Sequence, residues 1–165
     1  MWLPFELHPD VPAEGMSRDE YFPEHYRRRI ELSPYAGLAA EEGLLMKRSD
    51  RVINSRRALG AAEYARERGR FDEMHRALFR AHWEQTARLD DIEDLVRIGE
   101  GCGVDPDGLR AALTAGLYED LLDANRREAE QLGINAIPAH VFGLRYLVVG
   151  AHPYDLLKQV AEELA

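Results

Sequence analysis

The chain has 165 residues, of which 45% are hydrophobic and 31% are charged, and its formal net charge is −9. A chain of this length can bury roughly 70% of its unfolded surface in one domain. The acidic balance and the lack of a Lys/Arg block argue against nucleic acid or an anionic membrane as a partner. No segment approaches the roughly 20 apolar residues of a membrane span. The first residues lack the pattern of a signal peptide, so we expect a cytoplasmic protein.

The N-terminal third is expected to hold one strand and two helices. Trp2 to Leu7 is rich in aromatic and apolar residues, which predicts a short strand. A Pro- and Gly-containing loop follows, and Ser17 to Glu20 fits a capping box. We expect a helix from there through Ile30, with its basic run at 27–29 as a solvated face. Ser33-Pro34 should break that helix and begin a second one that ends near residue 42.

The middle of the chain is helical almost without interruption from residue 54 to residue 131. Apolar residues recur at helical spacing in five successive stripes, which predicts five amphipathic helices. Asp90 is the expected N-cap of the third of these helices. Asp105-Pro106 should cap the fourth, with proline at the first helical position. Gly133 is expected to end the fifth, which runs from about residue 117 to residue 131.

The final 30 residues have a different pattern. Residues 139–142 and 146–149 are two apolar, β-branched runs separated by Gly143-Leu144-Arg145, which predicts a hairpin. A last helix should follow Pro153, with Leu156, Leu157, Val160, Ala161 and Leu164 turned inward. Strand, helices, hairpin and helix in this order indicate an α/β domain with a helical insertion.

Pro138 stands directly before one predicted strand. A proline cannot donate to a sheet ladder, so it belongs at the first residue of a strand, where a cis bond is plausible. Gly133-Ile134-Asn135-Ala136-Ile137-Pro138 resembles the cis-proline loop of thioredoxin-like proteins. Trp2 to Pro9, Asn54 to Leu59 and Tyr146 to Pro153 each resemble segments of FrnE-type proteins, which belong to the DsbA-like family.

This resemblance implies a thioredoxin-like, DsbA-like α/β fold in one domain over residues 1–165. Residues 1–16 would be a strand and loop of its core, 17–132 a mostly helical insertion, and 133–165 the cis-proline loop, hairpin and last helix. It also implies a thiol–disulfide oxidoreductase or isomerase acting on protein or peptide substrates, with Ala136, Ile137 and Pro138 contacting the substrate.

The chain departs from the family in its missing N-terminal unit. The family begins with a strand, a Cys-x-x-Cys turn and a helix ahead of the segment that Trp2 to Pro9 resembles, and none of these is present here. Two smaller departures are Leu59, where histidine is common, and His152, where glutamine is usual. With Cys102 as the single cysteine there is no Cys-x-x-Cys and no expected catalytic residue, so we expect no dithiol exchange from this chain alone.

The missing strand would lie between residues 2–7 and residues 139–142, so both segments would lack a ladder partner. We expect the two strands to close on each other, or a second copy to fill the gap by dimerisation or strand exchange, or an upstream segment to supply the strand.

Three other features are candidate sites. Cys102 lies between two glycines with no basic neighbour, which favours a structural thiol. His75 and His82 share a helix face but lack the further ligands of a metal site, so we expect no metal. His140, in the strand after Pro138, is a possible functional residue.

Two alternative functions stay open. The first is a glutathione-dependent relative of 2-hydroxychromene-2-carboxylate isomerase and kappa-class glutathione transferase, which share the fold and place their key serine on the same missing turn. In this case alone we expect a cofactor-like ligand, glutathione. The second is a non-catalytic module that holds an extended peptide at the Pro138 loop.

Overall fold

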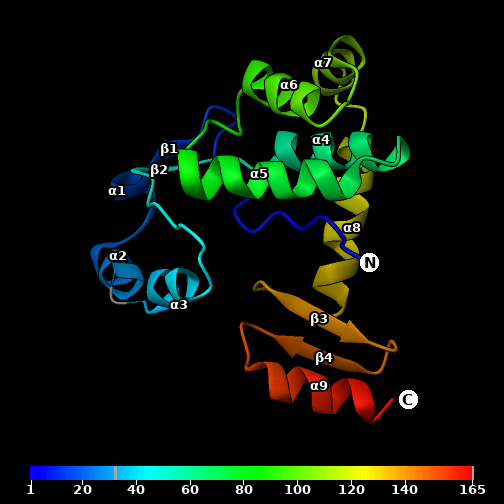
Figure 1. Ribbon diagram of the computed structural model, residues 1–165. Helices are drawn as coiled ribbons and strands as arrows, with labels where there is room; N and C mark the ends of the chain where they lie inside the picture. Colours follow the sequence, from blue (N-terminus) through cyan, green and yellow to red (C-terminus); the bar gives the residue numbers. More distant parts are fainter. Residues whose placement is uncertain (32, 165) are drawn as a thin grey trace.

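The computed structural model describes residues 1–31 and 33–164 of the chain. A helical body occupies one part of the molecule, and a β-hairpin with the last helix occupies another (Figure 1). The helices are α1 (Arg18–Tyr21), α2 (Glu24–Glu31), α3 (Tyr35–Glu41), α4 (Arg56–Glu67), α5 (Phe71–Gln85), α6 (Ile92–Gly101), α7 (Pro106–Thr114), α8 (Glu119–Gln131) and α9 (Tyr154–Glu162). The strands are β1 (Met16–Ser17), β2 (Arg51–Val52), β3 (Ala139–Phe142) and β4 (Tyr146–Val149).

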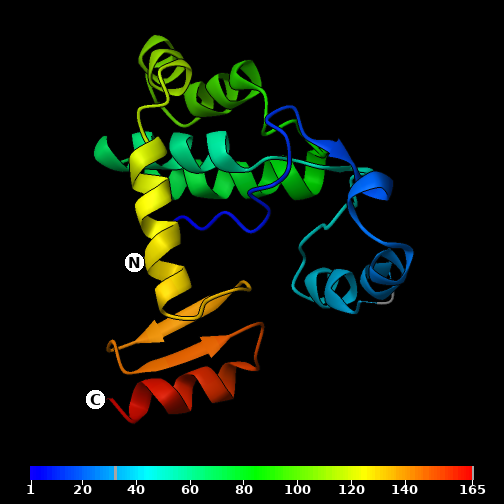
Figure 2. The ribbon, with the colours of Figure 1, turned by 180° about the vertical axis from the view of Figure 1, so that it is seen from behind.

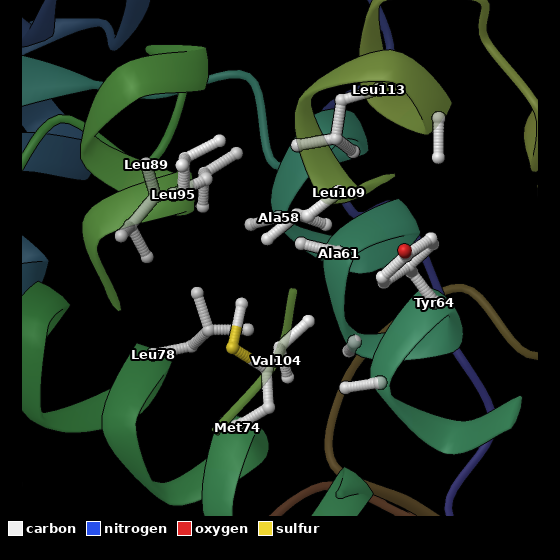
Figure 3. Close-up of a cluster of buried hydrophobic side chains, with 14 of the residues drawn as sticks. Ala58, Ala61, Tyr64, Met74, Leu78, Leu89, Leu95, Val104, Leu109 and Leu113 are labelled. Carbon is white, nitrogen blue, oxygen red and sulfur yellow. The ribbon is translucent and has the colours of Figure 1, made fainter. Parts of the chain in front are cut away.

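The hydrophobic core belongs to the helical body formed by α4, α5, α6 and α7. The apolar stripes predicted from the sequence meet here, and Met74, Leu95 and Leu109 are fully buried (Figure 3). Small residues on α4 let the neighbouring helices approach closely, since Ala61 and Ala65 have no exposed surface. Truncating a buried Leu or Met to Ala typically costs about 2–5 kcal/mol. The helical body therefore supplies most of the hydrophobic stabilisation of the chain.

The N-terminal segment is not a strand, contrary to the prediction for Trp2 to Leu7. It runs extended between the helical body and the hairpin (Figures 1 and 2). Side chains of α4 hold its backbone: Arg66 donates to the Trp2 carbonyl at 2.8 Å. Farther along, Asn54 donates to the Val11 carbonyl at 2.7 Å. A strand assignment requires a ladder partner, and no strand lies beside these residues in the described part of the chain.

The predicted helix through Ile30 is divided in two. Ser17 caps α1 as expected, because its hydroxyl accepts from the Asp19 N–H at 3.2 Å. Pro23 then forces Phe22 into an extended conformation, so α1 ends at Tyr21 and α2 begins at Glu24. Neither α2 nor α3 contains a buried residue among those described. This pair of helices therefore adds little to the core.

The caps of the later helices agree with the sequence with one exception. Asp105 caps α7 by accepting from the Gly108 N–H at 2.8 Å, and Pro106 occupies the first turn, as predicted. The N-cap of α6 is Asp91, which accepts from two first-turn N–H groups. The prediction of Asp90 was wrong by one residue, because that side chain is buried and pairs with Arg88 at 3.2 Å.

The hairpin has the predicted bounds, with β3 and β4 antiparallel and Ala139 opposite Val149. Its turn uses Gly143 and Leu144, both with positive φ, as a type I′ turn requires. The segment that follows the last helix lies beside this turn, since a Cβ added at Gly143 would lie 3.2 Å from the Leu164 side chain. None of the described residues in β3, β4 or α9 is buried. The inward face predicted for the last helix is thus at most half-buried.

Candidate substrate-binding loop

The end of α8 sets the direction of the loop that precedes β3. Gly133 adopts φ +75°, its N–H donates to the Glu130 carbonyl at 3.0 Å, and the Ile134 N–H donates to the Ala129 carbonyl at 2.8 Å. These two bonds form a Schellman motif, which requires a left-handed residue after the helix, a role that glycine fills without steric cost. The chain leaves α8 sharply and reaches β3 within a few residues.

Three residues of this loop were predicted to contact substrate. The structure brings them together at the entrance to β3, where the Ile137–Pro138 peptide bond is cis. Ala136 is half-buried, whereas Ile137 is 50% exposed and Pro138 is exposed. The Pro138 carbonyl accepts from the Gly150 N–H at 2.7 Å, which ties the loop to the far end of β4. The loop is therefore anchored on one side and presents an apolar side chain on the other.

His140 lies in β3 two residues beyond the loop. Its ring stacks on that of Phe142 on the same face of the hairpin, with 6.2 Å between centroids. The Nδ1 atom is enclosed and has no hydrogen-bond partner within the described residues. His140 is thus adjacent to the loop but contributes no identified polar contact to it.

Cys102 lies in the helical body, immediately after α6, and packs against the core there. Burial, with a smaller contribution from Glu73, raises the pKa of its thiol above the ordinary value. A raised pKa lowers the thiolate fraction and hence the nucleophilicity of the thiol at neutral pH. The structure places this cysteine on a different element from the Pro138 loop, as the sequence indicated.

His75 and His82 do not converge on a common ligand site. His75 lies between Phe71 and Phe79 along α5, stacked on the first ring at 5.1 Å and tilted against the second at 4.8 Å between centroids, and it contacts Trp2 at 5.3 Å. Burial is the largest cause of the lowered pKa of His75. His82 contacts the Trp83 ring instead, and burial lowers its pKa as well.

The sequence did not reveal the ionic contacts of Arg56. Its guanidinium bonds to the buried carboxylate of Glu6 at 3.0 Å, to Asp123 at 2.6 Å and to the Glu119 carboxylate. These contacts connect the N-terminal segment, the start of α4 and the start of α8. Because the partners are 50 to 67 residues apart in sequence, no local pattern could indicate them.

Two further observations concern residues 1–31 and 33–164. No group of three or more His, Cys, Asp or Glu side chains is placed to hold a metal ion. No helix in this part of the chain is long and apolar enough to cross a membrane.

A proline loop, a hairpin and a C-terminal helix follow the helical body, and the class of this protein is that of DsbA-like thioredoxin folds. The chain belongs to the family described as the DSBA-like thioredoxin domain, which matches residues 1–162.

Two known proteins are similar to this chain. A crystal structure of a probable DsbA oxidoreductase from Streptomyces coelicolor superimposes with a TM-score of 0.84 and 27% sequence identity. The match covers 96% of this chain and 72% of that one. The uncharacterized protein YwbO of Bacillus subtilis is 24% identical over 163 residues, which are 98% of this chain and 80% of the relative.

Proposed function

We propose that this chain is the polypeptide-binding portion of a FrnE-type thiol–disulfide oxidoreductase and does not carry out dithiol exchange alone. Membership in the DSBA-like thioredoxin domain family and the likeness to a probable DsbA oxidoreductase support the oxidoreductase lineage. The observation that carries the binding role is the anchored loop with its exposed Ile137 at the entrance to β3.

Inactivity in dithiol exchange follows from the thiol chemistry of the chain. Exchange requires a thiolate that attacks a disulfide and a second thiol that resolves the mixed disulfide. The chain contains one cysteine, and burial raises the pKa of that thiol. Both relatives extend beyond the matched region. We propose that a strand followed by a Cys-x-x-Cys turn, from another polypeptide segment, completes the active site.

Binding at the loop would use the backbone and one apolar side chain. An extended peptide beside Ile137 can exchange main-chain hydrogen bonds with the loop, which gives affinity with little sequence preference. Exposed Ile137 then offers an apolar contact to a neighbouring side chain of the peptide. Unfolded polypeptides with apolar residues have this chemistry, so they are the proposed substrates.

Binding is tested with a fluorescently labelled reduced, unfolded polypeptide and fluorescence anisotropy. Replacing Ile137→Ser should weaken binding several-fold. Leu144→Ser is the matched control, because Leu144 is 93% exposed in the hairpin turn, away from the loop. Equal affinities of the two variants, or no binding by the unmodified chain, would overturn the binding role.

Catalytic inactivity is tested by insulin reduction with dithiothreitol as reductant. The chain should not accelerate precipitation of the insulin B chain beyond the rate with dithiothreitol alone, and a thioredoxin serves as positive control. Acceleration that disappears in Cys102→Ser would contradict the proposal. Retention on immobilised glutathione would instead favour the isomerase-type alternative.

A further inference from the structure

The link between the Pro138 loop and β4 depends on one hydrogen bond. Ala139 pairs with Val149, so Pro138 and Gly150 are the next opposed residues, one step beyond the ladder. At a hydrogen-bonded position of an antiparallel pair two residues exchange two N–H···O bonds, but proline has no N–H to donate. Within the described residues, only the bond from the Gly150 N–H to the Pro138 carbonyl, at 2.7 Å, remains. The placement of the loop therefore depends on the orientation of the peptide group that carries this N–H.

The same peptide group is also held from its other side. Its carbonyl, which belongs to Val149, lies 3.0 Å from Nε2 of His152. A carbonyl oxygen can only accept, so Nε2 carries a proton and is the donor in this bond. A trans peptide group is planar, and its C=O and N–H point in opposite directions. The His152 and Pro138 bonds therefore act on opposite sides of one rigid unit, and rotation of that unit would break both.

The turn between β4 and α9 brings His152 to this carbonyl (Figure 1). Gly150 adopts φ +94°, which residues with a side chain rarely do. A Cβ added at Gly150 would lie 4.0 Å from Nε2 of His152, so the imidazole ring lies beside this glycine. Consecutive hydrogen bonds polarise and strengthen one another. The His152 donor thus orients the peptide group before Gly150 and strengthens the bond that this group makes to Pro138.

We propose that His152 is a positioning residue for the Pro138 loop. It fixes the peptide group before Gly150, which holds the Pro138 carbonyl and thereby the adjacent Ile137 side chain, in the arrangement that receives an extended polypeptide. The inference rests on the proposed function for its ligand, whereas the anchor itself consists of contacts within the chain. The role requires an N–H donor at position 152. Glutamine also has such a donor, and ionised glutamate has acceptors only.

Three substitutions separate the donor from the bulk of the side chain. His152→Gln keeps an N–H donor, His152→Glu has nearly the same shape as that variant without a donor, and His152→Leu is apolar. Hydrogen exchange of the Gly150 amide, followed by nuclear magnetic resonance, reports on the anchor without any ligand. We expect exchange about three- to tenfold faster in His152→Glu and His152→Leu, the effect of losing one hydrogen bond, and little change in His152→Gln.

The Val148 amide, two residues earlier in β4, is the internal comparison and should change less than that of Gly150. His25→Leu, at an exposed position on α2, is the matched control and should leave both amides unchanged. Equal exchange at Gly150 in His152→Gln and His152→Glu would overturn the positioning role. An equal increase at Gly150 and Val148 would do so as well, because it would indicate a general loosening of the hairpin.

Fluorescence anisotropy with the labelled unfolded polypeptide tests the consequence for binding. We expect His152→Glu and His152→Leu to weaken binding several-fold and His152→Gln to retain it, while circular dichroism checks that each variant keeps its helices. Undiminished binding by His152→Glu, despite faster exchange at Gly150, would overturn the inference and leave the proposed function intact. No binding by the unmodified chain would overturn the proposed function and, with it, the role of the anchor in binding.

Discussion

Arg56 shows how one side chain can organise distant parts of this molecule. Its three carboxylate partners belong to the N-terminal segment and to α8, and its own backbone begins α4. The guanidinium lowers the pKa of Asp123 through a hydrogen bond. Glu6 is the partner that matters most for stability, because its side chain is only 5% exposed. A buried carboxylate without its cation is much more costly than an exposed one.

We expect Arg56→Ala to lower the free energy of unfolding by about 2 kcal/mol, since it leaves the Glu6 carboxylate unpaired. Urea unfolding monitored by circular dichroism measures this loss. Arg97→Ala is the matched control, because Arg97 pairs with Asp94 on an exposed surface, where a pair contributes about 0.5 kcal/mol or less. Similar losses in the two variants would show that Glu6 does not depend on Arg56.

His75 makes stability depend on pH. Burial, followed by Arg66 and Arg76, lowers its pKa, while Asp72 acts in the opposite direction. The unfolded chain therefore takes up this proton more readily than the folded chain as the pH falls below about 6.5. The stabilisation of the folded chain that comes from neutral His75 is complete above that pH. It is lost as the pH falls toward the pKa of His75 in the folded state.

We accordingly expect the urea midpoint to decrease between pH 7.5 and pH 5.5, and His75→Gln to reduce that decrease. His8 and His82, whose pKa values burial also lowers, should account for part of the remaining dependence. His25→Gln, at an exposed position on α2, is the control and should leave the dependence unchanged. If His25→Gln and His75→Gln reduce the pH dependence of the urea midpoint equally, burial of His75 on α5 is not the cause of that dependence.

At the scale of elements, the contact between α4 and α7 depends on a glycine. A Cβ at Gly108 would lie 2.1 Å from the Tyr64 hydroxyl oxygen and 2.6 Å from the carboxylate of Asp105, the cap of α7. Tyr64 is buried and has little room to move. The helix can therefore approach α4 this closely only without a side chain at this position.

Gly108→Ala should lower the melting temperature, although alanine favours a helix over glycine by about 1 kcal/mol. The steric cost of overpacking, about 1–3 kcal/mol, exceeds that gain. Gly101→Ala at the end of α6 is the comparison, since no atom lies within 4 Å of its added Cβ. Thermal unfolding of both variants gives the two melting temperatures to be compared. A Gly108→Ala variant as stable as Gly101→Ala would mean that Tyr64 moves aside freely.

At the scale of the whole molecule, stability is unevenly distributed. The buried cluster runs from Ala58 to Tyr118, within the helical body, while none of the described residues of the hairpin and α9 is buried. Local opening is easiest where little apolar surface is buried. The part with the candidate binding loop is therefore less stable than the helical body.

Hydrogen exchange should resolve these two parts. We expect amides of β3, β4 and α9 to exchange much faster than those of α4 to α7 in dilute protein. Amides of α2 and α3, which also contain no buried residue, should exchange much faster than those of α4 to α7 as well. Uniform protection across the chain would contradict this division.

The sequence by itself determined features that depend on nearby residues. The hairpin bounds follow from apolar runs around a three-residue connection, the end of α8 from Gly133, and the start of α7 from Asp105-Pro106. The loop of Ala136 to Pro138 was also found in this way. Each is set by backbone preferences and hydrogen bonds within a few residues, which a local pattern records.

Only the tertiary structure decided the features that need a distant partner. Trp2 to Leu7 has the composition of a strand but lies along α4, because no strand is placed to pair with it in the described residues. The contacts of Arg56 likewise depend on which segments meet in space. Ladder pairing and ion pairing act across tens of residues, so composition and spacing cannot specify them.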